Sequence, residues 1–225
     1  MRQLMAALKR LFGAFRSSRE SSKKSESEAP SSIEWVVAGL GNPGDEYARS
    51  RHNSGFMTID RLAKKNGIAL NRKKFKGFLG DATLSDKSVL LVKPQIFYNL
   101  SGECIADLLG YFKIPVEHLI VVHDELDIEA GRFLIKQGGG DAGNRGVRSI
   151  AESLGSTNFI RVRIGIGRPA DPEANTEDDK DYLLRPMTSA ERQALESNLD
   201  RAASAVEALV ESGLERAMNR YNQRG

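Results

Sequence analysis

The stretch from Trp35 to Gly44, WVVAGLGNPG, combines a short apolar run with a G-x-G-x-x-G pattern. A strand followed by such glycines is typical of dinucleotide-binding folds, in which the third glycine opens a helix that holds the pyrophosphate. Here Pro43 removes one backbone donor from the loop, and no apolar helical stripe begins before Phe56. The stretch therefore favours a tight turn at the carboxyl end of a strand, which presents Asn42, over a nucleotide-binding loop.

Strands and helices alternate along the rest of the chain. Hydrophobic periodicity predicts strands at about 34–40, 76–84, 88–93, 118–123, 132–137 and 160–166. It predicts helices at about 53–66, 101–113, 143–154, 188–211 and 213–221. Residues 85–87, Ser-Asp-Lys, are expected at the tip of a hairpin. The pattern predicts an α/β fold, a single domain with a twisted mixed sheet flanked by helices on both faces.

Charge is distributed unevenly over the 225 residues. Residues 1–32 contain seven Lys/Arg and three Glu, and because the whole chain carries +3, residues 33–225 carry a net charge of −1. Nucleic-acid binding by residues 33–225 would therefore depend on local patches. Residues 61–76 and 132–168 each contain seven basic residues, although a solvated surface is the simpler interpretation of either. Acidic residues gather at 171–181, where we expect an exposed loop.

Residues 1–32 are expected to form an extension outside the domain of residues 33–225. The first 16 residues place Leu and Phe at helical spacing among four basic residues, a pattern typical of a basic amphipathic helix. A Ser/Lys/Glu-rich segment with few apolar residues follows. Three interpretations remain open: a helix that contacts a membrane surface or a partner, a mitochondrial transit peptide, and a disordered tail.

Several classes of protein are disfavoured by composition. The single cysteine, Cys104, excludes an internal disulfide and favours a cytoplasmic location. Three scattered histidines and one cysteine give little support to a structural zinc site, so no metal is expected. No apolar run approaches the roughly 18 residues of a membrane-spanning helix.

His52 is the first candidate for chemistry, because it lies in a polar loop before a helix and an imidazole can act as a general base near neutral pH. Its second ring nitrogen needs an orienting acceptor, and Asp124, Glu125 and Asp127 of the motif HDELD are available. The simpler alternatives are a surface histidine and a solvated acidic turn. The sequence alone does not bring these residues together.

Two further motifs carry polar residues. In KPQIFYNLSG at 93–102, Asn99 or Ser101 is expected to cap the following helix, or Asn99 to direct its amide into a site. The glycine-rich segment 138–146 would let backbone approach a ligand closely, or would form a mobile turn.

Together these motifs resemble those of bacterial-type peptidyl-tRNA hydrolases, and the resemblance covers residues 33–225. The matching stretches are GLGNPGDEYARSRHNSG at 39–55, KPQIFYNLSG at 93–102, HDELD at 123–127, KQGGGDAGNRGVRSI at 136–150, FIRVRIGIGRP at 159–169 and AMNRYN at 217–222. The resemblance implies a single α/β domain, usually monomeric, that cleaves the ester joining a peptide to the 3′ end of tRNA. It implies neither a metal nor an organic cofactor.

The resemblance also implies roles for individual residues. His52 would be the catalytic base that activates water, and Asp124 would orient it. The implied substrate-binding residues are Asn42, Tyr47, Asn53, Tyr98, Asn99, Asn144 and Arg145. The implied contacts to the tRNA backbone are Lys136, Arg161 and Arg163. Such basic contacts suit an enzyme that acts on many tRNAs, because they position phosphates without reading bases.

Three positions depart from the family pattern. The usual AGHNG reads AGNRG here, so Asn144 replaces a His and Arg145 replaces an Asn, and Tyr98 stands where Met is usual. Arg145 has no acceptor and cannot copy an amide, although it could hold a phosphate near the tRNA end. These departures raise an alternative function, a catalytically weak or inactive paralogue that binds RNA. The intact His52 and Asp124 favour the enzyme.

Overall fold

The computed structural model describes residues 32–168 and 179–223. The amphipathic helix expected at the N-terminus and most of the acidic segment 171–181 lie outside the described residues. Residues 32–225 form one compact unit of their own. In the described ranges, no helix is long and apolar enough to cross a membrane.

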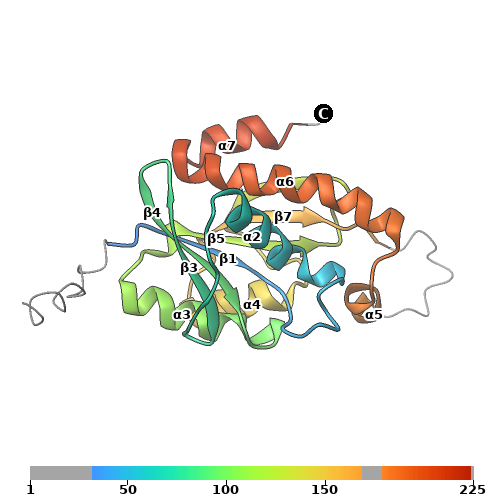
Figure 1. The fold of residues 1–225 in the computed structure, drawn as a ribbon, viewed down its shortest axis with the longest axis horizontal. Helices are drawn as coiled ribbons and strands as arrows, with labels where there is room; N and C mark the ends of the chain where they lie inside the picture. Colours follow the sequence, from blue (N-terminus) through green and yellow to red (C-terminus); the bar gives the residue numbers. More distant parts are fainter. Residues whose placement is uncertain (1–31, 169–178, 224–225) are drawn as a thin grey trace, which may run out of the picture. The chain divides into compact units, whose positions relative to one another are not determined.

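A seven-stranded mixed sheet is the centre of this unit (Figure 1). Its strands are β1 (Trp35–Gly39), β2 (Arg72–Lys74), β3 (Gly77–Leu84), β4 (Lys87–Pro94), β5 (Leu119–Glu125), β6 (Phe133–Gln137) and β7 (Ile160–Gly165). Their order across the sheet is β2-β3-β4-β1-β5-β7-β6. The four central strands are parallel, while β2, β3 and β6 pair antiparallel at the two sides. The predicted mixed α/β sheet is confirmed.

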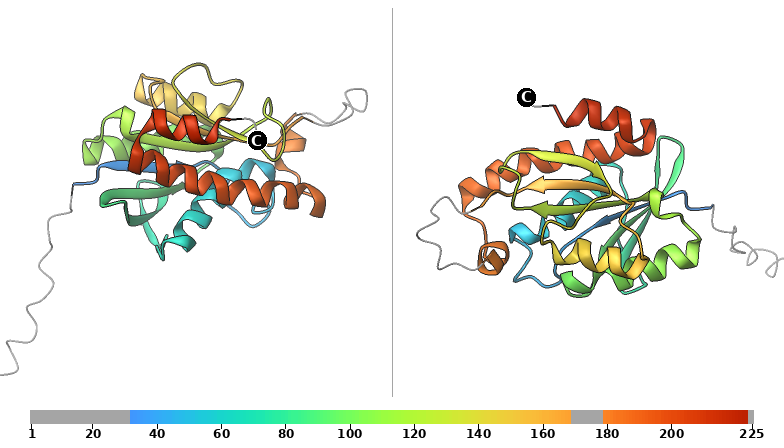
Figure 2. Two further views of the ribbon diagram at one scale, coloured as in Figure 1. Left: turned by 90° about the horizontal axis from the view of Figure 1, so that it is seen from above. Right: turned by 180° about the vertical axis from the view of Figure 1, so that it is seen from behind.

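Helices cover both faces of the sheet (Figure 2). They are η1 (Arg51–Asn53), α2 (Ser54–Lys65), η2 (Tyr98–Leu100), α3 (Ser101–Phe112), η3 (Val116–His118), α4 (Arg145–Leu154), α5 (Asp179–Leu184), α6 (Ser189–Ser212) and α7 (Leu214–Tyr221). Alternate residues of β1 face opposite sides. Val37 packs in the core beneath α2, α6 and α7, and Val36 packs in the core beneath α3 and α4. Burial on both faces explains the apolar runs in β1, in β4 and in the first half of β5.

The glycines of GLGNPG allow close packing of α2 against the end of β1. A Cβ atom on Gly41 would lie 2.6 Å from the ring of Phe56, and one on Gly55 would collide with the backbone of Leu40. Gly44, with φ of +117°, adopts a conformation that side chains rarely allow. Two parallel neighbours, β4 and β5, flank β1 at this point, so their carboxyl ends gather at the same edge of the sheet.

Two elements differ from expectation. Strand β2 consists of three exposed basic residues without an apolar alternation, and it forms because it pairs with β3 in a hairpin. Helix α5 begins at Asp179, inside the segment predicted as an acidic loop. The hydroxyl of Tyr182 in α5 donates to the Ile166 carbonyl at 3.0 Å and anchors this helix to the end of β7.

Candidate active site

The polar residues of the three parallel strand ends meet at one edge of the sheet. Asn42 follows β1, Tyr98 and Asn99 follow β4, and Asp124 lies near the end of β5. His52 reaches this edge from η1, between the turn after β1 and helix α2.

A buried arginine, Arg51, holds η1 against helices α5 and α6. The Arg51 guanidinium forms an ion pair with Glu191 in the first turn of α6. It also donates to the Tyr182 carbonyl at 3.0 Å and lies 4.0 Å from the centre of the Tyr182 ring. His52 is therefore carried by a segment that two later helices hold in place.

His52 and Asp124 form the closest acid–base pair of this edge. Nδ1 of His52 lies 2.9 Å from Oδ2 of Asp124, and because a carboxylate can only accept, Nδ1 carries the proton. The side chain of Asp124 is 3% exposed and that of His52 is 13% exposed. Burial would raise the pKa of Asp124, but the charge of His52 and hydrogen bonds from His52 and Tyr98 outweigh it and hold the pKa below its ordinary value.

The other acids of HDELD have different partners. Glu125 is buried and accepts two bonds from the Arg163 guanidinium, at 3.0 and 3.1 Å. Asp127 is exposed and pairs with Arg168. Of the three acceptors that the sequence offers to His52, the fold brings Asp124 to it.

Tyr98 lies against this pair rather than in the opening of the site. Its hydroxyl donates to Oδ1 of Asp124 at 2.7 Å and accepts from Nδ2 of Asn144 at 2.9 Å. Its ring is stacked on His52, with 3.5 Å between the ring centres. The residue is buried, so its contacts differ from those expected of a substrate ligand.

Asn42 and Asn53 stabilise each other. The Asn53 side chain accepts from the Asn42 backbone N–H at 2.8 Å and donates to its carbonyl at 3.0 Å. Oδ1 of Asn42 accepts from the backbone of Tyr98 at 2.9 Å. Within the described residues, Nδ2 of Asn42 has no partner, so it is the donor that remains for a ligand. Asn53 is buried and shapes the turn.

The rim of the site carries the remaining candidates. Asn99 and Arg145 are exposed and Tyr47 is half-buried. Phe97, beside Tyr98, is 65% exposed. The expectation that Asn99 or Ser101 caps α3 is wrong, because Leu100 occupies the cap position without a side-chain bond and the Ser101 hydroxyl donates to the Tyr98 carbonyl.

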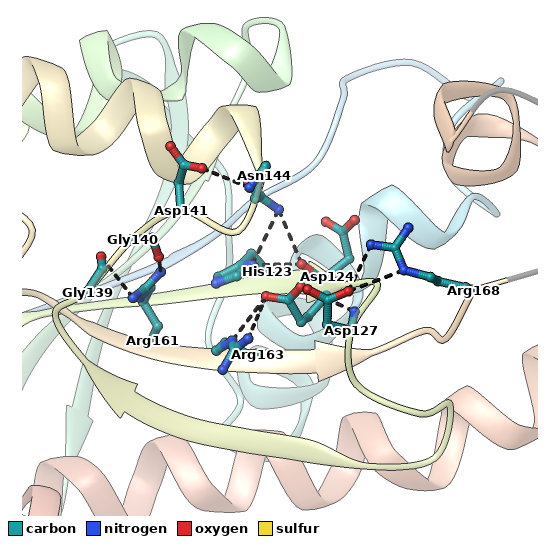
Figure 3. Close-up of polar contacts among 12 residues, drawn as sticks. His123, Asp124, Asp127, Gly139, Gly140, Asp141, Asn144, Arg161, Arg163 and Arg168 are labelled. Carbon is teal, nitrogen blue, oxygen red and sulfur yellow. Dashed lines mark hydrogen bonds and ion pairs between the residues drawn. The ribbon is translucent and has the colours of Figure 1, made fainter.

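The three expected tRNA-binding residues have unequal access. Arg161 is buried, and its guanidinium donates to the carbonyls of Gly138, Gly139 and Gly140, as Figure 3 shows in part. It therefore holds the glycine-rich loop in place and presents little exposed surface to a phosphate.

The other two basic residues are more accessible. Arg163 is only 19% exposed and engaged with Glu125. Lys136 is half-buried and has no acidic partner in the described part of the chain, which leaves its ammonium available to an anion.

Comparisons with known proteins identify the family of this chain. Residues 36–225 match the family model described as Peptidyl-tRNA hydrolase. The chain belongs to the peptidyl-tRNA hydrolase family. It is 44% identical over 191 residues to the peptidyl-tRNA hydrolase of Carboxydothermus hydrogenoformans, covering 85% of this chain and all of the relative. It is 46% identical to that of Streptomyces coelicolor, covering 84% of this chain and 94% of the relative.

Solved structures show the same family likeness. A crystal structure of the peptidyl-tRNA hydrolase from Acinetobacter baumannii matches with a TM-score of 0.76 and 36% identity, covering 84% of this chain and 96% of that one. Among the described residues of this family member, no group of three His, Cys, Asp or Glu side chains is arranged to hold a metal ion.

Proposed function

We propose that this chain hydrolyses the ester bond between peptide and tRNA in peptidyl-tRNA, with His52 as general base and Asp124 as the carboxylate that orients it. The observation that carries the assignment is the 2.9 Å bond between His52 and Asp124 at the sheet edge of a chain that belongs to this family. The same intact pair argues against the alternative, an inactive paralogue that only binds RNA.

The reaction needs no covalent intermediate, because an ester is already activated toward water. Asp124 fixes the proton on Nδ1 of His52, so Nε2 takes a proton from a water molecule as the water oxygen bonds to the ester carbonyl carbon. The ionised Asp124 stabilises the imidazolium that results. When the carbon–oxygen bond to the ribose breaks, His52 returns the proton to the ribose oxygen. Free tRNA and a peptide acid leave.

Four residues around the pair are suited to hold the substrate. The free amide hydrogens of Asn42 can donate to the ester carbonyl, and the exposed amide of Asn99 can contact the peptide or the water. Tyr47, half-buried between β1 and η1, is a further candidate contact, and Asn53 acts indirectly by holding Asn42. The exposed Arg145 is placed to contact a phosphate near the 3′ end of the tRNA.

For the tRNA backbone, Lys136 on β6 is the strongest of the expected contacts, with Arg163 on the neighbouring strand β7 as the second. Phosphate contacts of this kind make binding dependent on salt and independent of sequence. We further propose a monomer that works in the cytoplasm, with residues 1–32 as an extension that contacts a membrane surface or a partner, or that forms a disordered tail. If residues 1–32 are instead a transit peptide, the location is mitochondrial.

Replacement of His52 by Ala tests the proposal. Single-turnover cleavage of peptidyl-tRNA should slow by about 10²–10⁴-fold or more, because general-base catalysis is lost, while binding of tRNA stays largely intact. Replacement of His118 by Ala provides the control, since this half-buried histidine stacks on Trp35 away from the site. A His52→Ala variant that cleaves at the parent rate would show that the base is another group. Tight tRNA binding by a parent chain that releases no peptide would favour the RNA-binding alternative.

A further inference from the structure

Tyr98 and Asn144 link the N-terminus of α4 to the catalytic carboxylate. We propose that Tyr98 is a positioning residue that holds Asp124 for His52, and that Asn144 in turn holds Tyr98. The proposal rests on the proposed function, since it concerns the same acid–base pair. It gives both residues a different role from the substrate contacts that the family resemblance implies.

The two oxygens of Asp124 are divided between two partners. Oδ2 bonds Nδ1 of His52 at 2.9 Å and Oδ1 accepts the Tyr98 hydroxyl at 2.7 Å. With both oxygens engaged and the carboxylate buried, rotation about its terminal bond would break one hydrogen bond or the other. The Tyr98 ring adds a flat surface against the imidazole, with 16° between the two planes. Tyr98 thus restrains both members of the pair.

Asn144 is fixed by both ends of its amide. Its Oδ1 accepts from the backbone of Gly146 and Val147 and so caps α4. Its Nδ2 donates to the Tyr98 hydroxyl at 2.9 Å. It also donates to the Asp124 carbonyl at 3.2 Å, as Figure 3 shows. A Cβ atom on Gly146 would collide with the Tyr98 ring, so α4 packs directly against the tyrosine. The start of α4 therefore determines where the Tyr98 hydroxyl lies.

Two of the three positions that depart from the pattern implied by the resemblance, Tyr98 and Asn144, thus form one structural unit. The resemblance implies Met at position 98, and a thioether cannot donate to a carboxylate. In this chain the substituted residues contact each other, and Tyr98 supplies Asp124 with a donor that Met could not provide.

Tyr98 does not itself take part in proton transfer. Burial and the neighbouring Asp124 raise the pKa of its hydroxyl well above the ordinary value, so it stays protonated. Its proton points to Asp124, away from the opening where a substrate would bind. Its effect on the reaction must therefore pass through Asp124 and His52.

Loss of the hydroxyl should change the pH profile. The charged and titratable groups around the carboxylate are His52 from η1, Tyr98 from η2, His123 and Glu125 from β5, and Arg161 and Arg163 from β7. Without the Tyr98 hydroxyl, less of the negative charge on Asp124 is neutralised. Asp124 then attracts a proton on His52 more strongly, so the acidic limb of the activity profile moves to higher pH.

Tyr98→Phe tests this directly, because it keeps the ring and its stacking and removes only the hydroxyl. We expect kcat to fall by about 10-fold, the effect of one hydrogen bond to a buried charge, with KM unchanged and the acidic limb shifted upward. Asn144→Ser keeps a helix cap but loses the amide donor, and should shift kcat in the same direction by less. The double variant should lose less than the product of the two single effects, since Asn144 acts through Tyr98.

Ser149→Ala is the matched control. It removes a different bond from α4, the one its hydroxyl accepts from the Gly102 backbone, and it should leave kcat and the pH profile unchanged. A Tyr98→Phe variant with parental kcat and pH profile would overturn the proposal. So would a variant in which only KM rises, because that result would make Tyr98 a substrate ligand.

The NMR signal of the Nδ1 proton of His52 separates this proposal from the proposed function, because it needs no substrate. In Tyr98→Phe, the chemical shift of this proton should differ from that in the parent chain, since the carboxylate that accepts it has lost its second donor. An unchanged chemical shift would count against a link from Tyr98 through Asp124, whether or not the chain cleaves peptidyl-tRNA. A parent chain without cleavage, together with a changed chemical shift, would reject the reaction and keep the link.

Discussion

The contribution of Arg145 to substrate binding can be measured directly. It is exposed at the first position of α4, and no partner for its guanidinium lies within the described ranges. The N-terminus of a helix also attracts anions, so both the Arg145 guanidinium and the start of α4 would attract a tRNA phosphate.

Arg145→Asn should therefore weaken substrate binding. We expect a higher KM with little change in kcat, and a plot of log kcat/KM against log salt that is less steep by about one phosphate contact. Arg192→Asn is the control, because this exposed arginine of α6 pairs with Glu196, four positions further along the same helix. An unchanged KM and salt dependence would exclude a phosphate contact at Arg145.

Sequence reasoning reached the pair of His52 and Asp124 only as one choice among several. The two residues are separated by 72 positions, and HDELD offers three carboxylates. The pairing depends on η1, which the buried Arg51 ties to α5 and α6, and no local pattern reveals a tie of that range. The burial of Arg161 was missed for a similar reason, because its partners are backbone carbonyls that carry no sequence signal.

At the scale of elements, the C-terminal end of α7 completes the edge strand β6. The Asn222 side chain accepts from the backbone of Ile135 at 2.7 Å and donates to its carbonyl at 2.9 Å. Ile135 itself is buried, so both of its backbone groups depend on this one amide for partners.

Asn222→Ala should lower the free energy of unfolding by about 1–3 kcal/mol, the cost of leaving buried polar groups without partners. Urea unfolding measures this change. Gln223→Ala is the matched control, because Gln223 follows Asn222 directly and is exposed. Equal stability of the Asn222 and Gln223 variants would show that water replaces the lost amide.

The elements that periodicity identified are those whose stability comes from burial. The runs in β1 and β5 are apolar because helices cover both faces, and such runs are visible in the sequence. Strand β2 has exposed charges only, so its structure depends on pairing with β3. The sequence likewise did not predict the start of α5, because its acidic composition is typical of an exposed loop.

At the scale of the whole molecule, the stability of the fold should depend on one buried histidine. His123 is fully buried on β5, and Nε2 has no hydrogen-bond partner within the described part of the chain. Burial lowers the pKa of His123 to about 4, against the opposing charge of Asp124. In the unfolded chain the value returns to the ordinary 6.5, so between these values the unfolded state binds more protons.

Stability should therefore fall as the pH drops from 6.5 to 4, by about 3 kcal/mol in total from this group. Urea unfolding at pH 7 and pH 4.5 measures the loss. A His123→Gln variant should lose less stability between the two pH values than the parent, whereas His118→Gln, a control at a half-buried histidine of η3, should behave as the parent does. Parallel losses in all three chains would assign the acid sensitivity to other groups.

Residues 33–225 should carry the whole activity. The family match begins at residue 36, and the Carboxydothermus hydrogenoformans relative is covered over its full length by only 85% of this chain. A chain of residues 33–225 is expected to cleave peptidyl-tRNA with the kcat of the full chain. A large loss of kcat with intact folding would instead give the first 32 residues a part in the reaction.

The bond between Asn222 and Ile135 also matters while the chain is being synthesised. The two residues lie 87 positions apart, so a ribosome that adds 5–20 residues per second needs roughly 4–17 seconds to pass from one to the other. During that interval β6 has left the ribosome without the side chain that closes its outer edge. An open strand edge can pair with another chain. Asn222, which directly follows α7, therefore protects this edge of the sheet from neighbouring chains only after it has been synthesised.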